Sequence, residues 1–200
     1  MLGSLKRRAP YRDSRIFVIA TEGSVTEPHY FKIFTDPDFG GLSNRRIKRI
    51  DILPTEEGKS APNHVVARLD TYRDANDLGD GDQLWIVIDV DRWNNGGLLA
   101  RVSTLAKQKG YFLAVSNPNF ESWLLYHFIA SLPDCSLEFT NTVAVTCGNT
   151  KVTFDLTPYR ANLNQAIKNA KSDDRSQDDE WPQSHGSHVY KLVSQLMPRT

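Results

Sequence analysis

The sequence predicts an α/β fold: a mainly parallel sheet with helices on both faces, followed by a small helical C-terminal extension. Strand-like and helix-like segments alternate four times with short connections between them. Residues 15–21 and 84–88 are continuous apolar runs, which is typical of parallel strands buried on both faces. With 200 residues, of which 40% are hydrophobic, the chain is large enough to bury such a core.

The first half of the chain shows the alternation most clearly. Residues 15–21 form the first expected strand, which ends at the turn Glu22-Gly23. Thr26 and Pro28 are then typical of a helix start, and residues 29–34 have helical apolar spacing. The segments that follow are predicted as a strand over 48–54, a helix over 63–77 and a strand over 84–88.

The second half continues the pattern and then changes character. We expect a helix over 97–109, a strand over 111–116 and an aromatic-rich helix over 120–128. After Ala130 the alternation stops, so we divide the chain into a core (1–130) and a C-terminal extension (131–200). Within the extension we expect irregular chain with possible short strands over 132–150, one amphipathic helix over 158–171, a polar loop or disordered segment over 172–187, and a closing helix over 188–197.

Hydropathy and cysteine spacing argue against several classes of protein, whereas the net charge does not. Lys+Arg and Asp+Glu number 24 each, so the net charge of +0 gives no indication for or against nucleic-acid binding. No apolar run approaches the roughly 20 residues of a membrane helix, so we expect no membrane association. Cys135 and Cys147 have neither CxxC nor metal-site spacing. We therefore expect free thiols in a cytoplasmic protein.

Acidic residues follow the ends of several predicted strands. Glu22 comes after the first strand, with Glu27 on the turn beyond it, and Asp89 and Asp91 come after the strand over 84–88. Glu121 opens the helix after the fourth strand. Because sites in open α/β sheets lie beyond the carboxyl ends of the strands, we expect these carboxylates to gather at one edge.

A gathered set of carboxylates repels itself unless a cation neutralises it. Hard oxygen ligands favour Mg²⁺ or Mn²⁺, so the sequence predicts a divalent-metal site. Each acid also has a structural interpretation. Asp89 or Asp91 could cap the next helix, Glu22 could be a turn residue, and Glu27 and Glu121 could favour a helix dipole.

The motifs around these acids resemble a known family. The phrases TEGSVTEPHYF, IDVDRW, SNPNFESWLLYHF and SHVYKLVSQL are similar to the RloB/AbiLii-like family along most of the chain. The strand ending in Glu-Gly and the later strand ending in Asp-x-Asp also resemble the Rossmann-like TOPRIM domain of topoisomerases, primases and OLD-type nucleases.

This resemblance implies a function and a site. It maps Glu22 to the general acid/base or metal ligand of TOPRIM nucleases, Asp89 and Asp91 to the Mg²⁺-binding pair, and Glu27 to a further acid of OLD-type nucleases. Glu121 matches the glutamate of the SNPxFE stretch and is left without a role. The resemblance further implies a bacterial or phage-defence protein, often encoded beside an AAA/ABC-like ATPase.

We therefore expect a Mg²⁺- or Mn²⁺-dependent nuclease that cuts DNA or RNA as a toxic effector in abortive infection, controlled by an ATPase partner. Basic residues are candidate ligands of the substrate phosphates, and the alternative for the cluster around Arg45 is a solvated loop. These candidates are Arg45, Arg46, Lys48, Arg49 and Arg92. The rival functions are a non-catalytic TOPRIM-like module that docks on an ATPase, and a nucleotide-binding sensor.

Overall fold

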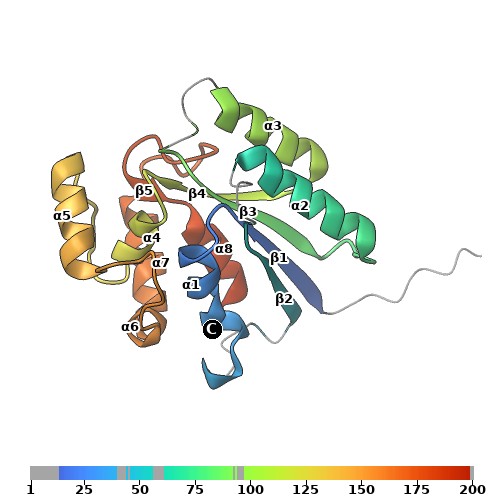
Figure 1. The fold of residues 1–200 in the computed structure, drawn as a ribbon, viewed down its shortest axis with the longest axis horizontal. Helices are drawn as coiled ribbons and strands as arrows, with labels where there is room; N and C mark the ends of the chain where they lie inside the picture. The colour runs from blue at the N-terminus through green and yellow to red at the C-terminus, as the bar shows by residue number, and fades with distance from the viewer. Residues whose placement is uncertain are drawn as a thin grey trace, which may run out of the picture.

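A five-stranded sheet forms the centre of the molecule (Figure 1). The computed structural model describes residues 14–39, 44, 46–55, 61–91, 93 and 97–198. The strands are β1 (Arg15–Thr21), β2 (Ile47–Leu53), β3 (Gln83–Asp89), β4 (Phe112–Asn117) and β5 (Gly186–Ser187), in the order β2-β1-β3-β4-β5. The first four are parallel and β5 is antiparallel to β4. The predicted α/β class is therefore confirmed.

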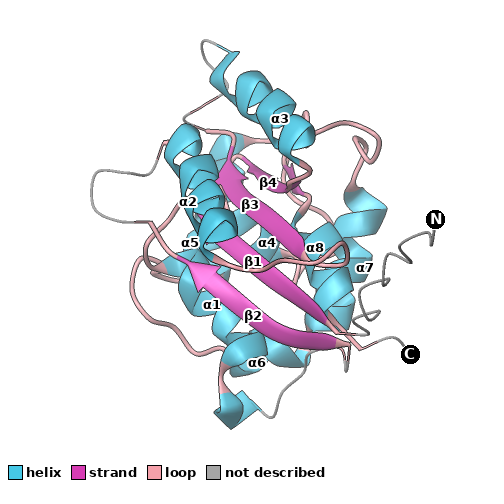
Figure 2. Ribbon diagram, turned by 90° about the vertical axis from the view of Figure 1, so that its right-hand side faces the viewer, coloured by secondary structure: helices cyan, strands magenta, loops and turns pink. Residues whose placement is uncertain are grey.

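The helices cover both faces of the sheet (Figure 2). On one face Val18 and Ala20 of β1 belong to a buried cluster with α2 and α3, and on the other Phe17 and Ile19 share a cluster with α1, α4, α7 and α8. This division follows from the alternation of side chains along a strand. The helices are α1 (Thr26–Thr35), α2 (Pro62–Ala75), α3 (Leu98–Lys109), α4 (Glu121–Leu125), α5 (Ser136–Thr146), α6 (Thr157–Ala161), α7 (Leu163–Asp173) and α8 (Val189–Leu196), with a short 3₁₀ helix, η1 (Pro37–Phe39).

The strand order places a topological switch point between β1 and β3. The chain leaves β1 through α1 toward β2, on one side, and leaves β3 through α3 toward β4, on the other. Because the two connections diverge, the loops after β1 and β3 leave a crevice between them. Ligand sites of open α/β sheets lie at such points.

The expectation of irregular chain over 132–150 is wrong, because residues 136–146 form the helix α5. The β-branched residues of SLEFTNTVAVT favour a strand or coil. In the structure Phe139 and Val143, four residues apart, pack against the core cluster, and the hydroxyl of Thr140 donates to the carbonyl of Ser136 at 2.9 Å. Tertiary packing thus overrides a weak local preference.

Two other parts of the extension differ from expectation. The single helix expected over 158–171 is interrupted at Asn162, whose N–H donates to the carbonyls of Pro158 and Tyr159, so α6 and α7 are separate helices. Within 172–187, the residues Gly186 and Ser187 pair with the end of β4 as β5. The aromatic-rich helix is also shorter than expected, since α4 ends at Leu125 and turns follow.

Polar contacts hold the chain between α7 and α8 against the rest of the extension. Asp174 accepts hydrogen bonds from the N–H of Ser176 (2.8 Å) and the hydroxyl of Tyr190 (3.0 Å). The same carboxylate lies 3.1 Å from Nε2 of the buried His188. The Ser187 hydroxyl lies 2.8 Å from the Ser116 hydroxyl on β4. The extension is therefore joined directly to the sheet.

Both cysteines are free thiols. In the described part of the chain no helix has the length and apolar character needed to cross a membrane.

The shared cluster predicts that α8 and the sheet unfold together. Leu192 of α8 is fully buried in the cluster that contains Phe17 and Ile19, so Leu192→Ala should lower the free energy of unfolding by about 2–5 kcal/mol. Urea unfolding followed by fluorescence and by circular dichroism should show one common transition. The matched control, Leu137→Ala, removes a side chain that is 71% exposed and should change stability by less than about 0.5 kcal/mol. A separate transition of the sheet in Leu192→Ala would contradict the shared core.

Candidate functional site

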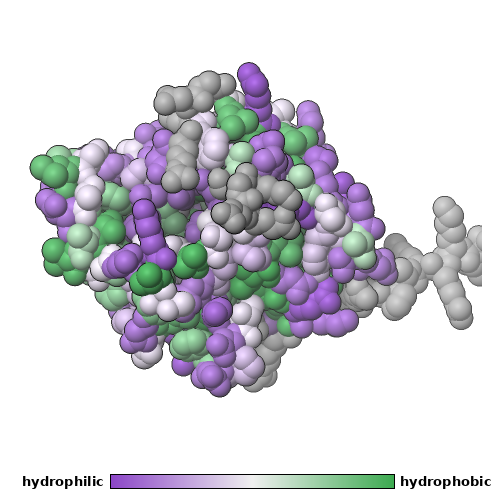
Figure 3. Space-filling model, in the orientation of Figure 1, coloured by the Kyte–Doolittle hydropathy of each residue, from purple (hydrophilic) through white to green (hydrophobic). Residues whose placement is uncertain are grey.

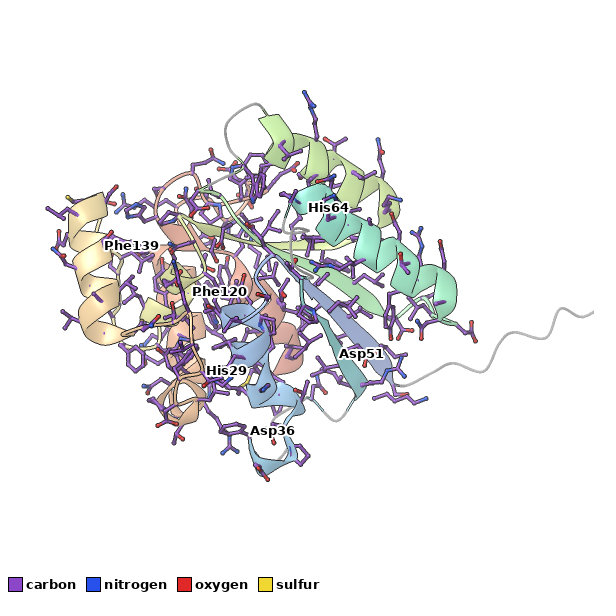
Figure 4. The ribbon with its side chains drawn as sticks, viewed as in Figure 1. His29, Asp36, Asp51, His64, Phe120 and Phe139 are labelled. Atoms are coloured by element: carbon purple, nitrogen blue, oxygen red, sulfur yellow. The ribbon has the colours of Figure 1, made fainter. Side chains whose placement is uncertain are left out.

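An open cleft of about 470 Å³ lies at the carboxyl ends of β1, β3 and β4. It occupies the switch point, next to the start of α1, and the buried ring of Phe120 lies beside that helix (Figure 4). The cleft brings together all five carboxylates that the sequence singled out. Its lining is Glu22, Gly23, Ser24, Val25, Thr26, Glu27, Thr55, Asp89, Asp91, Asn119, Phe120, Glu121 and Lys151.

Glu22 is held between β1 and β3. Its side chain is almost completely buried. Its Oε2 accepts a hydrogen bond from the backbone N–H of Asp89 at 3.0 Å, and its Oε1 accepts one from the indole N–H of Trp93 at 2.9 Å. Its own N–H donates to the carbonyl of Val87 at 2.9 Å. The carboxylate therefore has a defined position at the floor of the cleft.

Glu27 is placed by the tight turn that joins β1 to α1. The N–H of Gly23 donates to its Oε1 at 2.9 Å. A Cβ at position 23 would lie 2.1 Å from Oε2 of Glu27 and would displace this carboxyl group. The glycine of the Glu-Gly sequence therefore allows the Glu27 carboxyl group to approach the backbone closely.

Asp89 is the last residue of β3, and Asp91 lies on the loop that follows it. Asp89 is half-buried and Asp91 is exposed. This loop is tied to the end of β4, because the N–H of Val90 donates to the carbonyl of Ser116 at 2.9 Å and the N–H of Asp91 donates to that of Pro118 at 3.0 Å. Both acids are therefore fixed by backbone contacts with the neighbouring strand.

The C-terminal extension supplies another wall of the cleft. The hydroxyl of Thr150 donates to Oε1 of Glu121 at 2.5 Å, and the hydroxyl of Thr26 donates to the carbonyl of Thr150 at 2.8 Å. Nearby, a ring nitrogen of His29 lies 2.7 Å from the carbonyl oxygen of Phe154. These contacts attach the segment after α5 to α1 and bring Lys151 to the cleft.

Burial and the neighbouring carboxyl groups raise the pKa of Glu27 and of Asp89. Burial, together with smaller contributions from the charges of Glu22 and Glu121, raises the pKa of Glu27 from 4.5 to about 7. Burial likewise raises the pKa of Asp89 well above its ordinary value, with contributions from the charges of Glu27, Glu22, Asp91 and Glu121. Near neutral pH the cluster therefore retains protons or requires a counter-charge.

The donor set has the chemistry that Mg²⁺ or Mn²⁺ prefers, since it consists of carboxylates. Among the described residues, however, no three His, Cys, Asp or Glu side chains are already arranged to hold a metal ion. Both oxygens of Glu22 also accept hydrogen bonds. The residues thus fit a divalent cation in chemical type and in charge, but the carboxyl groups would have to rotate toward one another to share it.

Three of the basic residues predicted to bind substrate lie away from this cleft. Arg46 precedes β2, and Lys48 and Arg49 lie in its first three residues, whereas the cleft lies at the opposite ends of the parallel strands. Arg49 instead pairs with Asp51 at 2.7 Å and donates to the hydroxyl of Tyr72 at 2.6 Å. Their contact with substrate phosphates stays a prediction. The other two candidates, Arg45 and Arg92, lie outside the described residues.

Sequence reasoning missed three contributors to the site. Thr150 ends the segment over 132–150 that was expected to be irregular, and Lys151 follows it directly; their placement depends on contacts with residues more than 100 positions away. The indole N–H of Trp93 holds Glu22. Its position two residues after Asp91 was the only local signal for a role at this edge.

Comparison with known proteins agrees with part of the resemblance. A model of the family described as RloB-like protein matches residues 17–196. This match confirms the RloB-like resemblance, while the relation to TOPRIM domains remains a prediction. No curated protein and no solved structure matched the chain.

The raised pKa of Glu27 predicts how stability depends on pH. Between about pH 4.5 and 7 this carboxyl group binds a proton in the folded state and loses it in the unfolded state, so stability falls as the pH rises. Glu27→Gln keeps an acceptor for Gly23 and removes the charge. In EDTA, the variant should therefore gain up to about 3 kcal/mol relative to wild type between pH 5 and pH 8.

Urea unfolding at each pH measures this difference. The matched control is Glu138→Gln, because Glu138 is an exposed glutamate on α5 and should follow the wild-type curve. Parallel curves for wild type and Glu27→Gln would show that Glu27 titrates normally.

Proposed function

We propose that this chain, which belongs to the RloB-like family, is a metal-dependent nuclease that hydrolyses phosphodiester bonds in DNA or RNA. The observation that carries the proposal is the convergence of Glu22, Glu27, Asp89, Asp91 and Glu121 on one open cleft at the switch point. A divalent ion bound by some of these carboxylates would polarise a phosphoryl oxygen and lower the pKa of bound water.

Stability alone does not account for this arrangement. Carboxyl groups that are buried beside one another destabilise the fold unless they are protonated or neutralised. Glu22 and Glu27 are nearly inaccessible, yet the cleft beside them is open. Such a site is suited to binding a cation together with a group that brings further oxygen ligands, as a phosphodiester does.

The protein residues have separate roles in this proposal. Glu22, fixed by Asp89 and Trp93, holds negative charge at the floor of the cleft. Glu27, with a pKa of about 7, can accept or release a proton at neutral pH. Lys151 is the one basic side chain among the described residues that line the cleft, so it is suited to contact a substrate phosphate.

We further propose that the nuclease acts in anti-phage defence and that an AAA/ABC-like ATPase controls it. Support for these two points comes from the family resemblance. Cleavage is therefore measured on single-stranded DNA, duplex DNA and tRNA, and in the presence of the ATPase where one is encoded next to the nuclease.

Divalent metal should stabilise the wild-type protein and not the variants that lack ligands. Binding at about 100 times the Kd adds about 2.7 kcal/mol, which raises the Tm of a domain of this size by roughly 5–10 °C. In EDTA, Asp89→Asn should have a higher Tm than wild type because it removes charge repulsion. With Mn²⁺ the increase should be smaller in Asp89→Asn than in wild type. Asp38→Asn, at an exposed carboxylate of η1, is the control that should behave as wild type.

Cleavage should depend on the carboxylates as a unit. Glu22→Gln, Asp89→Asn and Asp91→Asn should each lower the cleavage rate by at least about 100-fold, and the double variants should lose little more. The reason is that each change weakens the hold on the same ion. Multiplicative losses in the double variants would instead indicate independent roles.

Lys151→Met separates substrate contact from metal binding. It should lower cleavage while the stabilisation by Mn²⁺ stays at the wild-type value, because Lys151 bears no ligand for a cation. Wild-type cleavage in Asp89→Asn/Asp91→Asn would remove these acids from the mechanism. If there is neither metal binding nor cleavage on any substrate while the ATPase complex still forms, the protein is a docking module and the proposed function is wrong.

A further inference from the structure

Asn119 brings to the cleft a buried polar atom that its surroundings leave without a partner. The residue lines the cleft together with the acidic side chains. Its side-chain oxygen, Oδ1, is inaccessible to solvent and accepts no hydrogen bond from any residue that the structure describes. A buried acceptor without a donor costs roughly 1–3 kcal/mol. This position therefore calls for a ligand that satisfies an oxygen atom.

The backbone holds Asn119 between two of the acids. The N–H of Asp91 donates to the carbonyl of Pro118, the residue before Asn119, at 3.0 Å. Glu121 follows shortly after Asn119 and also lines the cleft. The carbonyl of Asn119 itself accepts the N–H of Ser122 at 3.0 Å. The amide is thus presented from a turn that is fixed on both sides, so little freedom is lost when it binds a ligand.

The groups around Oδ1 indicate which ligand would satisfy it. Ionised carboxylates only accept hydrogen bonds, so in that state the neighbouring acids cannot donate to it. Lys151, the basic residue of the described cleft lining, does not donate to it either. A divalent cation satisfies an amide oxygen and carboxylates at the same time, because carboxylate and carbonyl oxygens are the ligands that Mg²⁺ and Mn²⁺ favour.

We propose that Oδ1 of Asn119 is a further ligand of the divalent cation in this cleft. The inference rests on the proposed function, since it takes the carboxylates to hold that cation. An amide supplies an oxygen ligand without negative charge, which suits a site where another carboxylate would increase the repulsion. Within the described chain, no three His, Cys, Asp or Glu side chains are already arranged for a metal. A neutral ligand reduces the number of carboxyl groups that have to rotate toward the ion.

Removal of the amide distinguishes a metal ligand from a residue that the fold requires. In EDTA, Asn119→Ala should have the Tm of wild type or a higher one, because it removes an acceptor that has no partner. Its Kd for Mn²⁺, measured by isothermal titration calorimetry, should be at least about 10-fold higher than that of wild type, since even residues that only orient metal ligands contribute about 10–100-fold. The matched control is Asn164→Ala, which removes an exposed amide from α7 and should keep the wild-type Kd.

A cysteine at position 119 tests for direct contact with the ion. The background for this test carries Cys135→Ser and Cys147→Ala, because both native cysteines are free thiols. In it, Asn119→Cys should bind one equivalent of Cd²⁺ and show the ultraviolet charge-transfer band of a cadmium–thiolate bond, since thiolates favour soft metals. Asn164→Cys, an exposed cysteine on α7, should show no such band at the same Cd²⁺ concentration.

These measurements need no cleavage, so they separate the two proposals. If wild type binds Mn²⁺ and Asn119→Ala has the same Kd, or if Asn119→Cys gives no thiolate band, Asn119 is not a ligand while the nuclease proposal stands. A Tm of Asn119→Ala well below that of wild type in EDTA would assign the amide to the fold and overturn the inference. If wild type binds no divalent ion, both proposals are wrong.

Discussion

The buried carboxylate of Glu22 is the constraint on which the rest of the site depends. It lies where β1 and β3 end, and it is satisfied by the N–H of Asp89 and the indole of Trp93. These two bonds tie the turn after β1 to the loop after β3, which is tied in turn to the end of β4. A charge in this position costs free energy. Apolar clusters cover both faces of the central strands and offset this cost.

The C-terminal extension completes the cleft as well as the core. Its helix α8 packs beneath β4, and β5 extends the sheet beyond β4. The segment after α5 reaches α1 through Thr150 and Phe154, and through these contacts Lys151 enters a cleft otherwise lined by acidic, polar and apolar residues. The division of the chain into a core and an extension is therefore useful for describing its sequence pattern, but the candidate site contains residues from both parts.

Much of the fold could be predicted because it depends on local pattern. The continuous apolar runs identify β1 and β3 to within one residue at either end, and the alternation with helices predicts parallel strands whose carboxyl ends share an edge. This rule alone brings Glu22, Asp89 and Glu121 together. The placement of Lys151 could not be predicted in this way, since it rests on contacts between α1 and residues more than 100 positions later. The same rule places Lys48 and Arg49, at the start of the strand predicted over 48–54, at the opposite edge of the sheet, where the structure has them.

Helix α5, which lies where irregular chain was expected, could not be predicted because it too depends on tertiary contacts. A helix with β-branched residues and one buried side chain has little intrinsic stability, and an isolated helix of this length is marginal in water. Phe139 and Val143 pack one side of α5 against the core, while Leu137 and Val145 on the other side are exposed. On the space-filling surface, hydrophobic residues gather at the left edge, where α5 lies (Figure 3). The ring of Phe139 lies against the ring of His185, which comes much later in the chain. A contact of this kind leaves no local signal in the sequence, so the tertiary packing that determines this helix could not be predicted from it.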